Sequence, residues 1–474
     1  MLDIAYVGSG MGASLSAALN HKKNIKVFEK DQNLGGCAST FERQHYHYNA
    51  GATTFVGYEH HHPVKKIFDY INLQPDISQS NIAIRTIQNN KVVDRVKEFD
   101  RFLEQINDIY PHPNNKTFWK TLKQIDEQFW NIQKNHQLFF GKHSFANYAQ
   151  TIQTAWKLFG SFGLSLLKNA KDYIDETLTG ISQEYQNFIE AQLLITVQTT
   201  SQNISLLGLA LGLSYPFHDV FYANKGMGNI ITDLLKDIPT STKNQITKIE
   251  TFRNHFVLHT SNNSYEAKNI VVNSTIYDSS KLFDNNQIKQ YYDSFEFSDQ
   301  SAYVVYLTLD NSSKKTFLDH YQVILDQIIP NCISNSFFIS FSHSDDPLLS
   351  KNNTLSVTIS THTKGEFWTN LDKQSYKNLK TATHKFILQE FLRIFDTIEE
   401  ENIINQFSGT SKTFSRFINR VNCGGKGYGV NNIMQIPSCN SPFKGIYNAG
   451  DTVFAGQGWP GVAVGVHSLQ YFLK

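Results

Sequence analysis

The first pattern in the chain is a short apolar run, a glycine-rich turn and a helical pattern. Ile4 to Val7 form the run, and apolar positions spaced as in a helix follow from Ala13 to Leu19. A second apolar run, "NIKVFEK", ends at Glu29. This strand–turn–helix–strand order predicts the start of a parallel, Rossmann-like sheet.

Helical and β patterns occupy separate blocks further along. Residues 61–219 are mostly helical in pattern, as is the stretch from Ser375 to Asp396. "SAYVVYLTLD" and "TLSVTISTHT" are rich in β-branched residues, which indicates strands. The blocks between the nucleotide-binding segments therefore predict a second region, a sheet covered by helices.

Composition narrows the class of protein. Hydrophobic residues make up 40% and charged residues 18% of 474 residues, an ordinary globular balance. The net charge of +1 provides no bulk attraction to nucleic acid or an anionic membrane. The four cysteines form no CxxC pair, which indicates a reduced, intracellular set, so we expect a cytoplasmic protein.

The glycine-rich turn is typical of dinucleotide binding. Gly8 permits the tight turn, Gly10 lets the backbone approach a pyrophosphate, and Ala13 is small enough for close helix–strand packing. Met11 and Gly12 begin the helix, whose free N–H groups can bind phosphates, and we include both among the predicted contacts.

Glu29 lies 21 residues after Gly8, close to the spacing expected for an acid that binds a ribose 2′-hydroxyl. A carboxylate there argues against a 2′-phosphate. The adjacent Lys30 fits a solvated charge better than a ligand, although it stays among the candidate contacts.

Further glycines extend the predicted site beyond an adenine nucleotide. Gly35 and Gly36 follow the second strand, and another glycine comes shortly before Thr53 and Thr54. Such glycines suit a longer ligand that continues past the pyrophosphate, which favours FAD. The two glycines and two threonines are therefore candidate contacts.

The C-terminal stretch "NAGDTVFAGQGWPGVAVGVHSLQ" contains five glycines and one carboxylate, Asp451. Glycine loses more backbone entropy on folding than any other residue. A ligand that approaches the backbone closely would explain such a stretch.

These motifs together resemble the phytoene desaturase, carotenoid isomerase and retinol saturase family of flavoproteins. The resemblance extends from end to end, through "VGSGMGA", "LGGCAST", "YANKGMGNIITDL", "QITKIE", "GTSKTFSRFINR" and "YNAGDTVFAGQGWPGVAVG". It implies that Asp451, beside Gly450, accepts a hydrogen bond from the ribityl chain. It also implies that Gly461 and Val462 begin the last helix at the pyrimidine side of the flavin, and that Ile246 in "QITKIE" contacts the cofactor.

The resemblance implies an α/β fold in which a discontinuous Rossmann-like FAD-binding domain joins a second, α+β substrate domain of sheet covered by helices. We assign 1–60, 220–276 and 420–474 to the first domain, and 61–219 and 277–419 to the substrate-binding region.

The function implied is an FAD-dependent oxidoreductase that desaturates, saturates or isomerises a long apolar, carotenoid- or retinoid-like polyene. No catalytic acid or base can be named, and Gln457 and Trp459 either face the substrate or only hold their loop. Two alternatives stay open: a flavin amine oxidase, and a non-enzymatic carrier of the GDP-dissociation-inhibitor type.

Two further features bear on metal binding and membrane contact. Adjacent histidines at 60–62 cannot easily bind one ion, so we expect a surface turn before Pro63 and no metal site. The apolar stretch from Ala155 to Ile174, with Leu206 to Phe217, fits either a mouth in peripheral contact with a membrane or a buried helix pair. The expected partner is a small apolar substrate, with no nucleic acid.

Overall fold

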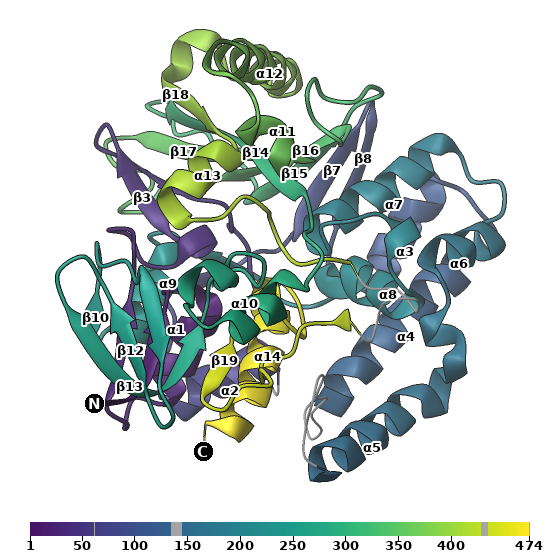
Figure 1. Cartoon of the computed structure of the whole chain (residues 1–474). Coiled ribbons are helices and arrows are strands. Elements are labelled where there is room, and N and C mark those ends of the chain that lie inside the picture. The colour runs from purple at the N-terminus through teal and green to yellow at the C-terminus, as the bar shows by residue number, and fades with distance from the viewer. Residues whose placement is uncertain (61, 134–144, 428–434, 474) are drawn as a thin grey trace.

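The fold is built around two large mixed sheets, with a group of helices to one side (Figure 1). A computed structural model describes residues 1–60, 62–133, 145–427 and 435–473. Among the described residues, no helix is long and apolar enough to cross a membrane.

The bounds of the regular elements follow in chain order. The strands are β1 Leu2–Val7, β2 Ile25–Phe28, β3 Thr40–Arg43, β4 Tyr46–Asn49, β5 Phe55–Val56, β6 Ile77–Gln79, β7 Ile84–Gln88, β8 Lys91–Arg95, β9 Val220–Ala223, β10 Thr240–Ser241, β11 Lys248–Thr251, β12 Phe256–His259, β13 Ser264–Val272, β14 Gln300–Asp310, β15 His320–Ile324, β16 Ser336–Phe341, β17 Thr354–Lys364, β18 Ile403–Gly409 and β19 Ile446–Asn448. The helices are α1 Met11–Leu19, α2 Pro63–Tyr70, α3 Phe99–Ile109, α4 Asn115–Gln133, α5 Phe145–Phe162, α6 Ala170–Thr177, α7 Gln183–Thr196, α8 Leu206–Ser214, α9 Met227–Leu235, α10 Asn286–Asp293, α11 Gly365–Thr369, α12 Lys373–Ile394, α13 Ser411–Ile418 and α14 Gly458–Phe472.

The first sheet has the order β10-β2-β1-β13-β12-β11, and β19 pairs with β13. Strands β10, β2, β1, β13 and β19 are parallel, whereas β12 is antiparallel to both of its neighbours, β13 and β11. The predicted Rossmann-like α/β fold is therefore confirmed. The strands of this sheet fall at residues 2–28, 240–272 and 446–448, far apart in the sequence.

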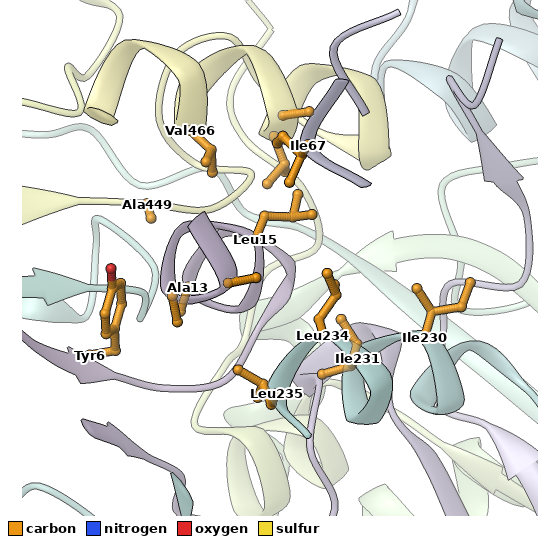
Figure 2. Close-up of a cluster of buried hydrophobic side chains, with 14 of the residues drawn as sticks. Tyr6, Ala13, Leu15, Ile67, Ile230, Ile231, Leu234, Leu235, Ala449 and Val466 are labelled. Carbon is orange, nitrogen blue, oxygen red and sulfur yellow. The ribbon is translucent and has the colours of Figure 1, made fainter. Parts of the chain in front are cut away.

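Helices α1, α9 and α14 share one apolar core beside this sheet, as Figure 2 shows. Leu15 of α1 lies near Val466 of α14 and Leu234 of α9, and all three are buried. Burying such a side chain contributes about 1.5–3 kcal/mol. The C-terminal helix therefore belongs to the core of the nucleotide-binding unit.

The second sheet has the order β18-β14-β17-β16-β15-β7-β8. Strands β14 and β17 confirm the two predicted β segments, and α12 covers the sheet with the predicted apolar face. Strands β7 and β8 were not predicted, because they lie inside the block with a helical pattern. Their turn is formed by Asn89 with φ +53, a conformation in which asparagine is common.

The remaining helices, α3 to α8, form a separate apolar core. In Figure 1, α4 and α5 project from this group at the lower right. Helix α8 packs against α4 and α7, so its apolar residues are largely buried.

A partly buried ionic network connects three distant segments of the chain. His218 lies 3.1 Å from Glu59 Oε2 through Nδ1 and 2.5 Å from Asp126 Oδ2 through Nε2. Burial by itself lowers the pKa of His218, but hydrogen bonds and charges of the two carboxylates outweigh it and raise that pKa to about 10. The imidazolium therefore stabilises the fold across neutral pH.

This network predicts a stability loss at alkaline pH. His218→Gln should cost about 3 kcal/mol at pH 6, because it leaves Asp126 buried without its counter-ion. The contribution of His218 is fully present below its unfolded pKa, about 6.5, and is lost as pH rises through the folded value. Urea unfolding of both proteins should show a free-energy difference that shrinks toward pH 10.

The exposed His45 provides the control for this titration, because its side chain is 98% exposed. His45→Gln should follow the wild type at every pH. A difference between His218→Gln and wild type that stays constant from pH 6 to 10 would contradict a charged His218.

Candidate functional site

The turn between β1 and α1 lies directly against the end of β2. Ser9 donates to Glu29 Oε2 through its backbone nitrogen at 2.9 Å and its hydroxyl at 2.6 Å. The backbone nitrogen of Asp31 donates to the other carboxylate oxygen at 2.9 Å. Gly8, with φ +97, permits this turn. Glu29 is thus buried beside the glycine turn, and its bond to a ribose stays a prediction.

The start of α1 is packed against two distant segments. Ala13 donates its backbone N–H to Asn273 Oδ1 at 3.0 Å. A Cβ added to Gly10 would lie 2.4 Å from Asn273 Nδ2, and one added to Gly12 would lie 2.5 Å from the backbone nitrogen of Gly450. These glycines therefore have a packing role as well as the predicted role at a pyrophosphate. Sequence reasoning missed Asn273, although it directly follows a strand adjacent to β1.

The two glycines after β2 have different surroundings. Gly35 donates its backbone N–H to the Ser9 hydroxyl at 3.0 Å, and an added Cβ would lie 3.0 Å from the carbonyl of Ala38. Gly36 has φ +58, and no atom lies within 4 Å of the position of a Cβ. Gly35 is thus required for packing, whereas Gly36 leaves open space beside the first turn.

Ile246 lies in a loop near the end of β2. It is buried with Val7 and Phe28 in one apolar cluster. The backbone nitrogen of Asn244, two residues earlier, donates to the carbonyl of Glu29 at 2.9 Å. The loop that carries Ile246 is therefore fixed beside the end of β2.

Asp451 is held by an arginine that sequence reasoning did not assign. Arg420 donates to both carboxylate oxygens, from Nη1 at 3.0 Å and from Nη2 at 2.8 Å. Its Nε donates to the carbonyl of Asn422 at 2.7 Å, and Cys37 Sγ lies 3.7 Å from Nη1. Arg420 therefore ties the C-terminal motif to the segment after β2. Each Asp451 oxygen retains further lone-pair capacity, so its predicted ribityl bond stays a prediction.

The last helix begins earlier than predicted. It starts at Gly458 after the N-cap Gln457, so the expectation that Gly461 and Val462 begin it is wrong by three residues. Pro460 lies in the first turn of this helix, where proline is well tolerated. Val462 is buried in the core, whereas a Cβ added to Gly461 would lie 3.0 Å from the carbonyl of Gly456.

One cavity of about 1250 Å³ joins the nucleotide-binding unit to the second sheet and the helices. Ligand pockets commonly measure about 300–1,000 Å³, so this one can hold a large ligand or two adjoining ones. The predicted site residues on its walls are Met11, Lys30, Thr53, Thr54, Asp451 and Gly461. Gly8, Gly10, Gly12, Ala13, Glu29, Gly35, Gly36, Ile246, Gly450 and Val462, all described residues, are not part of these walls. Apolar wall residues include Phe129, Ala155, Leu158, Leu211 and Phe407.

Thr53 and Thr54 connect this cavity to the second sheet. The Ser340 hydroxyl donates to Thr53 Oγ1 at 2.8 Å, and Thr54 Oγ1 lies 3.3 Å from His320 Nε2. Lys30 Nζ donates to Asn419 Oδ1 at 3.4 Å. All three predicted residues thus contact other protein groups as well as the cavity.

His362 and Gln198 are polar residues of the cavity wall that the sequence did not indicate. His362 lies 2.8 Å from Gln198 Oε1 through Nε2, and burial lowers the pKa of His362 to about 4. Its imidazole is therefore neutral at pH 7, and the glutamine oxygen accepts a hydrogen bond from Nε2–H. Gln457 Nε2 donates to the carbonyl of Thr196 at 2.9 Å, and Trp459 Nε1 lies 3.3 Å from Met227 Sδ. Gln457 and Trp459 thus both hold their loop and line the cavity.

The histidines at 60–62 do not form a surface turn as a unit. His62 is 7% exposed, and its ring centroid lies 4.3 Å from that of Trp130. Burial lowers the pKa of His62 to about 3, so the ring is neutral. The expectation of exposure is wrong for this residue, and residue 61 lies outside the described ranges. Within those ranges, no group of three His, Cys, Asp or Glu residues could hold a metal ion.

Comparisons with known proteins agree with this geometry. Residues 7–71 match the family model described as an NAD(P)-binding Rossmann-like domain. A chloroplastic prolycopene isomerase of Daucus carota is 20% identical over 97% of this chain and 78% of its own length. An all-trans-retinol 13,14-reductase of Danio rerio is 24% identical over 27% of this chain and 23% of its own length.

Solved structures of similar fold extend over the whole chain. An oxidoreductase from Methanosarcina mazei has a TM-score of 0.64 at 14% identity, covering 99% of both chains. Cyclohexylamine oxidase from Brevibacterium oxydans has a TM-score of 0.60 at 14% identity, covering 100% of this chain and 98% of its own. At this identity the solved structures show the fold alone. The two relatives, by their names a prolycopene isomerase and a retinol reductase, support the predicted enzyme and the resemblance to the phytoene desaturase, carotenoid isomerase and retinol saturase family.

Proposed function

We propose that this chain is an FAD-dependent oxidoreductase that acts on a long apolar polyene of the carotenoid or retinoid type. The reaction is desaturation, saturation or cis–trans isomerisation. The observation that carries this proposal is the single cavity that extends from Met11 and Asp451 to the apolar walls at Phe129 and Leu211. A cofactor at one end and an elongated apolar chain at the other would lie next to each other.

The residues present fit FAD. The first turn of α1 offers backbone N–H groups to a pyrophosphate, and Glu29 lies beside it for a ribose. Gly36 and Gly456 have no atom within 4 Å of the position of a Cβ, which leaves room for a ligand against the backbone. Asp451 and Gly461 are the candidates at the ribityl and ring end. When bound, FAD would supply hydride transfer.

The chain itself contributes cavity-wall histidines that are either neutral or paired with carboxylates. Neutral His62 and His362 line the cavity, and the charge of His218 is balanced by Asp126 and Glu59. At these three positions, an apolar chain in the cavity would not meet an unpaired charge. Asp126 and His218, which line the cavity near Phe129, are paired with each other, so positioning is the main role that we propose for the protein.

The reaction is tested with FAD-loaded protein and a set of carotenoid and retinoid polyenes, with oxidised and chemically reduced cofactor in separate reactions. Chromatography with mass detection should show a product that has lost two hydrogens, gained two, or changed only its retention. Turnover of amines with no polyene product would favour the amine oxidase alternative. Protein that binds no FAD and still binds an apolar ligand would favour a carrier.

Gly36 provides a test of cofactor placement. Gly36→Ala should weaken FAD binding about tenfold, because an added methyl group fills the open space beside the first turn. The left-handed backbone should cost about 1–2 kcal/mol of stability in addition. FAD titration followed by flavin fluorescence measures the affinity.

Gly180 is a matched control, because it also has positive φ, +78, and no atom within 4 Å of the position of a Cβ. Gly180→Ala should lose similar stability and retain wild-type FAD affinity. Equal affinities for the two variants would remove Gly36 from the cofactor site.

The ion pair between Arg420 and Asp451 provides a second test. Asp451→Asn should weaken FAD binding, and so should Arg420→Met, which releases the carboxylate. If Asp451 also bonds the ribityl chain, Asp451→Asn should still lower affinity about tenfold in the Arg420→Met background. A double-mutant cycle in FAD affinity separates the two roles. No further loss in that background would mean that Asp451 acts only through Arg420.

A further inference from the structure

His62 is a polar side chain of the cavity wall with an unused hydrogen-bonding atom. It lines the cavity, is 7% exposed and packs against Trp130. Its Nδ1 is buried and has no hydrogen-bond partner among the residues that the structure describes. Buried polar atoms of native proteins are paired in the great majority of cases. An unpaired one on the wall of a ligand-sized cavity therefore points to a contact with the ligand.

The ring of His62 is uncharged. Burial, followed by the charge of His218, lowers the pKa of His62 to about 3, and the smaller opposing effects of Glu59 and the Gly57 backbone do not offset this. A neutral imidazole carries one N–H donor and one acceptor nitrogen. Its natural counterpart in a ligand is an uncharged group that both donates and accepts a hydrogen bond, such as a hydroxyl.

The polar side chains around His62 are already paired with one another. Asp126 Oδ2 lies 2.5 Å from Nε2 of His218, and Asp126 Oδ1 accepts a hydrogen bond from Nε1 of Trp130 at 3.0 Å. Glu59 Oε2 lies 3.1 Å from Nδ1 of His218. None of these residues offers a free counter-ion to a carboxylate or an ammonium group. An uncharged end group therefore fits beside His62 better than a charged one.

Gly57 places the ring of His62 beside the C-terminal motif. A Cβ added to Gly57 would lie 2.8 Å from Nδ1 of His62 and 3.1 Å from Cγ of Pro460, and all three residues line the cavity. Pro460 lies in the first turn of α14, the helix that begins in the glycine-rich stretch. His62 is therefore on the part of the wall next to the candidate cofactor motif, and a group bound by it would hold the adjoining part of a polyene there.

We propose that His62 binds a hydroxyl group at one end of the substrate, so that the preferred polyene is an alcohol and not a pure hydrocarbon. The apolar walls at Phe129 and Leu211 bind the chain. The hydrogen bond to His62 decides which end of the polyene, and so which of its double bonds, lies next to Pro460. His62 is thus a specificity-determining residue. This inference rests on the proposed function for the polyene chain and the cofactor.

The test compares the affinities of two matched probes, all-trans-retinol and the hydrocarbon in which a hydrogen replaces its hydroxyl group. Binding to the FAD-saturated full chain is measured by quenching of protein fluorescence, without an electron donor, so that no turnover is required. In His62→Phe the ratio of the two dissociation constants should change about tenfold against the alcohol, because the buried hydroxyl loses its partner. The affinity for the hydrocarbon, which reports an intact cavity, should stay within about threefold of wild type.

Two further variants separate hydrogen bonding from packing. His62→Gln retains a donor and an acceptor, and should keep the ratio of the two probes within about threefold of wild type. His467→Phe is the matched control. Burial also lowers the pKa of His467, and its Nε2 lies 3.0 Å from the carbonyl oxygen of Pro63, but His467 is not part of the cavity walls. This variant should leave the ratio unchanged.

Three results would overturn the hydroxyl subsite. One is a probe ratio that His62→Phe leaves unchanged. Another is a ratio lost equally in His62→Gln and His62→Phe, because the shape of the ring and not its hydrogen bonding would then decide. The third is tighter binding of retinoic acid or retinylamine, whose end groups are charged, than of retinol. Absence of binding by both retinol and the hydrocarbon would instead contradict the proposed function itself, and the subsite with it.

Discussion

The close backbone contact between Gly12 and Gly450 is the constraint on which the candidate site depends. An added Cβ on Gly12 would lie 2.5 Å from the nitrogen of Gly450. A larger side chain at position 12 would therefore push α1 and the C-terminal motif apart. Asn273 stabilises the same contact, because its Oδ1 accepts a hydrogen bond from the backbone N–H of Ala13. Because Asp451 follows Gly450 directly, this contact also places the Arg420 ion pair at the cavity wall. Three segments from the beginning, middle and end of the chain thus create one ligand-sized space.

Much of the nucleotide-binding half could be predicted from the sequence, because its signals are local. The spacing from Gly8 to Glu29 predicts two parallel strands whose ends meet, and hydrogen bonds from Ser9 to Glu29 show that they do. The β-branched runs at β14 and β17 were equally readable. These features depend on periodicity and turn chemistry within about 30 residues, which a single sequence displays.

The rest depends on contacts between distant residues. Arg420 and Asp451 lie 31 residues apart in irregular segments, so nothing in the sequence pairs them. Asn273 follows an ordinary strand, and only the neighbouring strand β1 places it against Gly10. His62 is buried because Trp130 covers it, which a run of three histidines does not indicate. The start of α14 was misplaced because Gly461 was interpreted as the first residue of the helix. The structure shows instead that Gly461 lies inside the helix, where the absence of a side chain lets the backbone of Gly456 come close.

A crystal structure of the FAD-loaded protein with a bound polyene would test the central claim most directly. The ADP part of the cofactor should lie between the first turn of α1 and Glu29, with the flavin ring near Asp451 and Gly461. The polyene should extend from the ring along Phe129, Ala155 and Leu211. A flavin ring outside the cavity, or a polyene bound away from these walls, would contradict a single site shared by cofactor and apolar substrate.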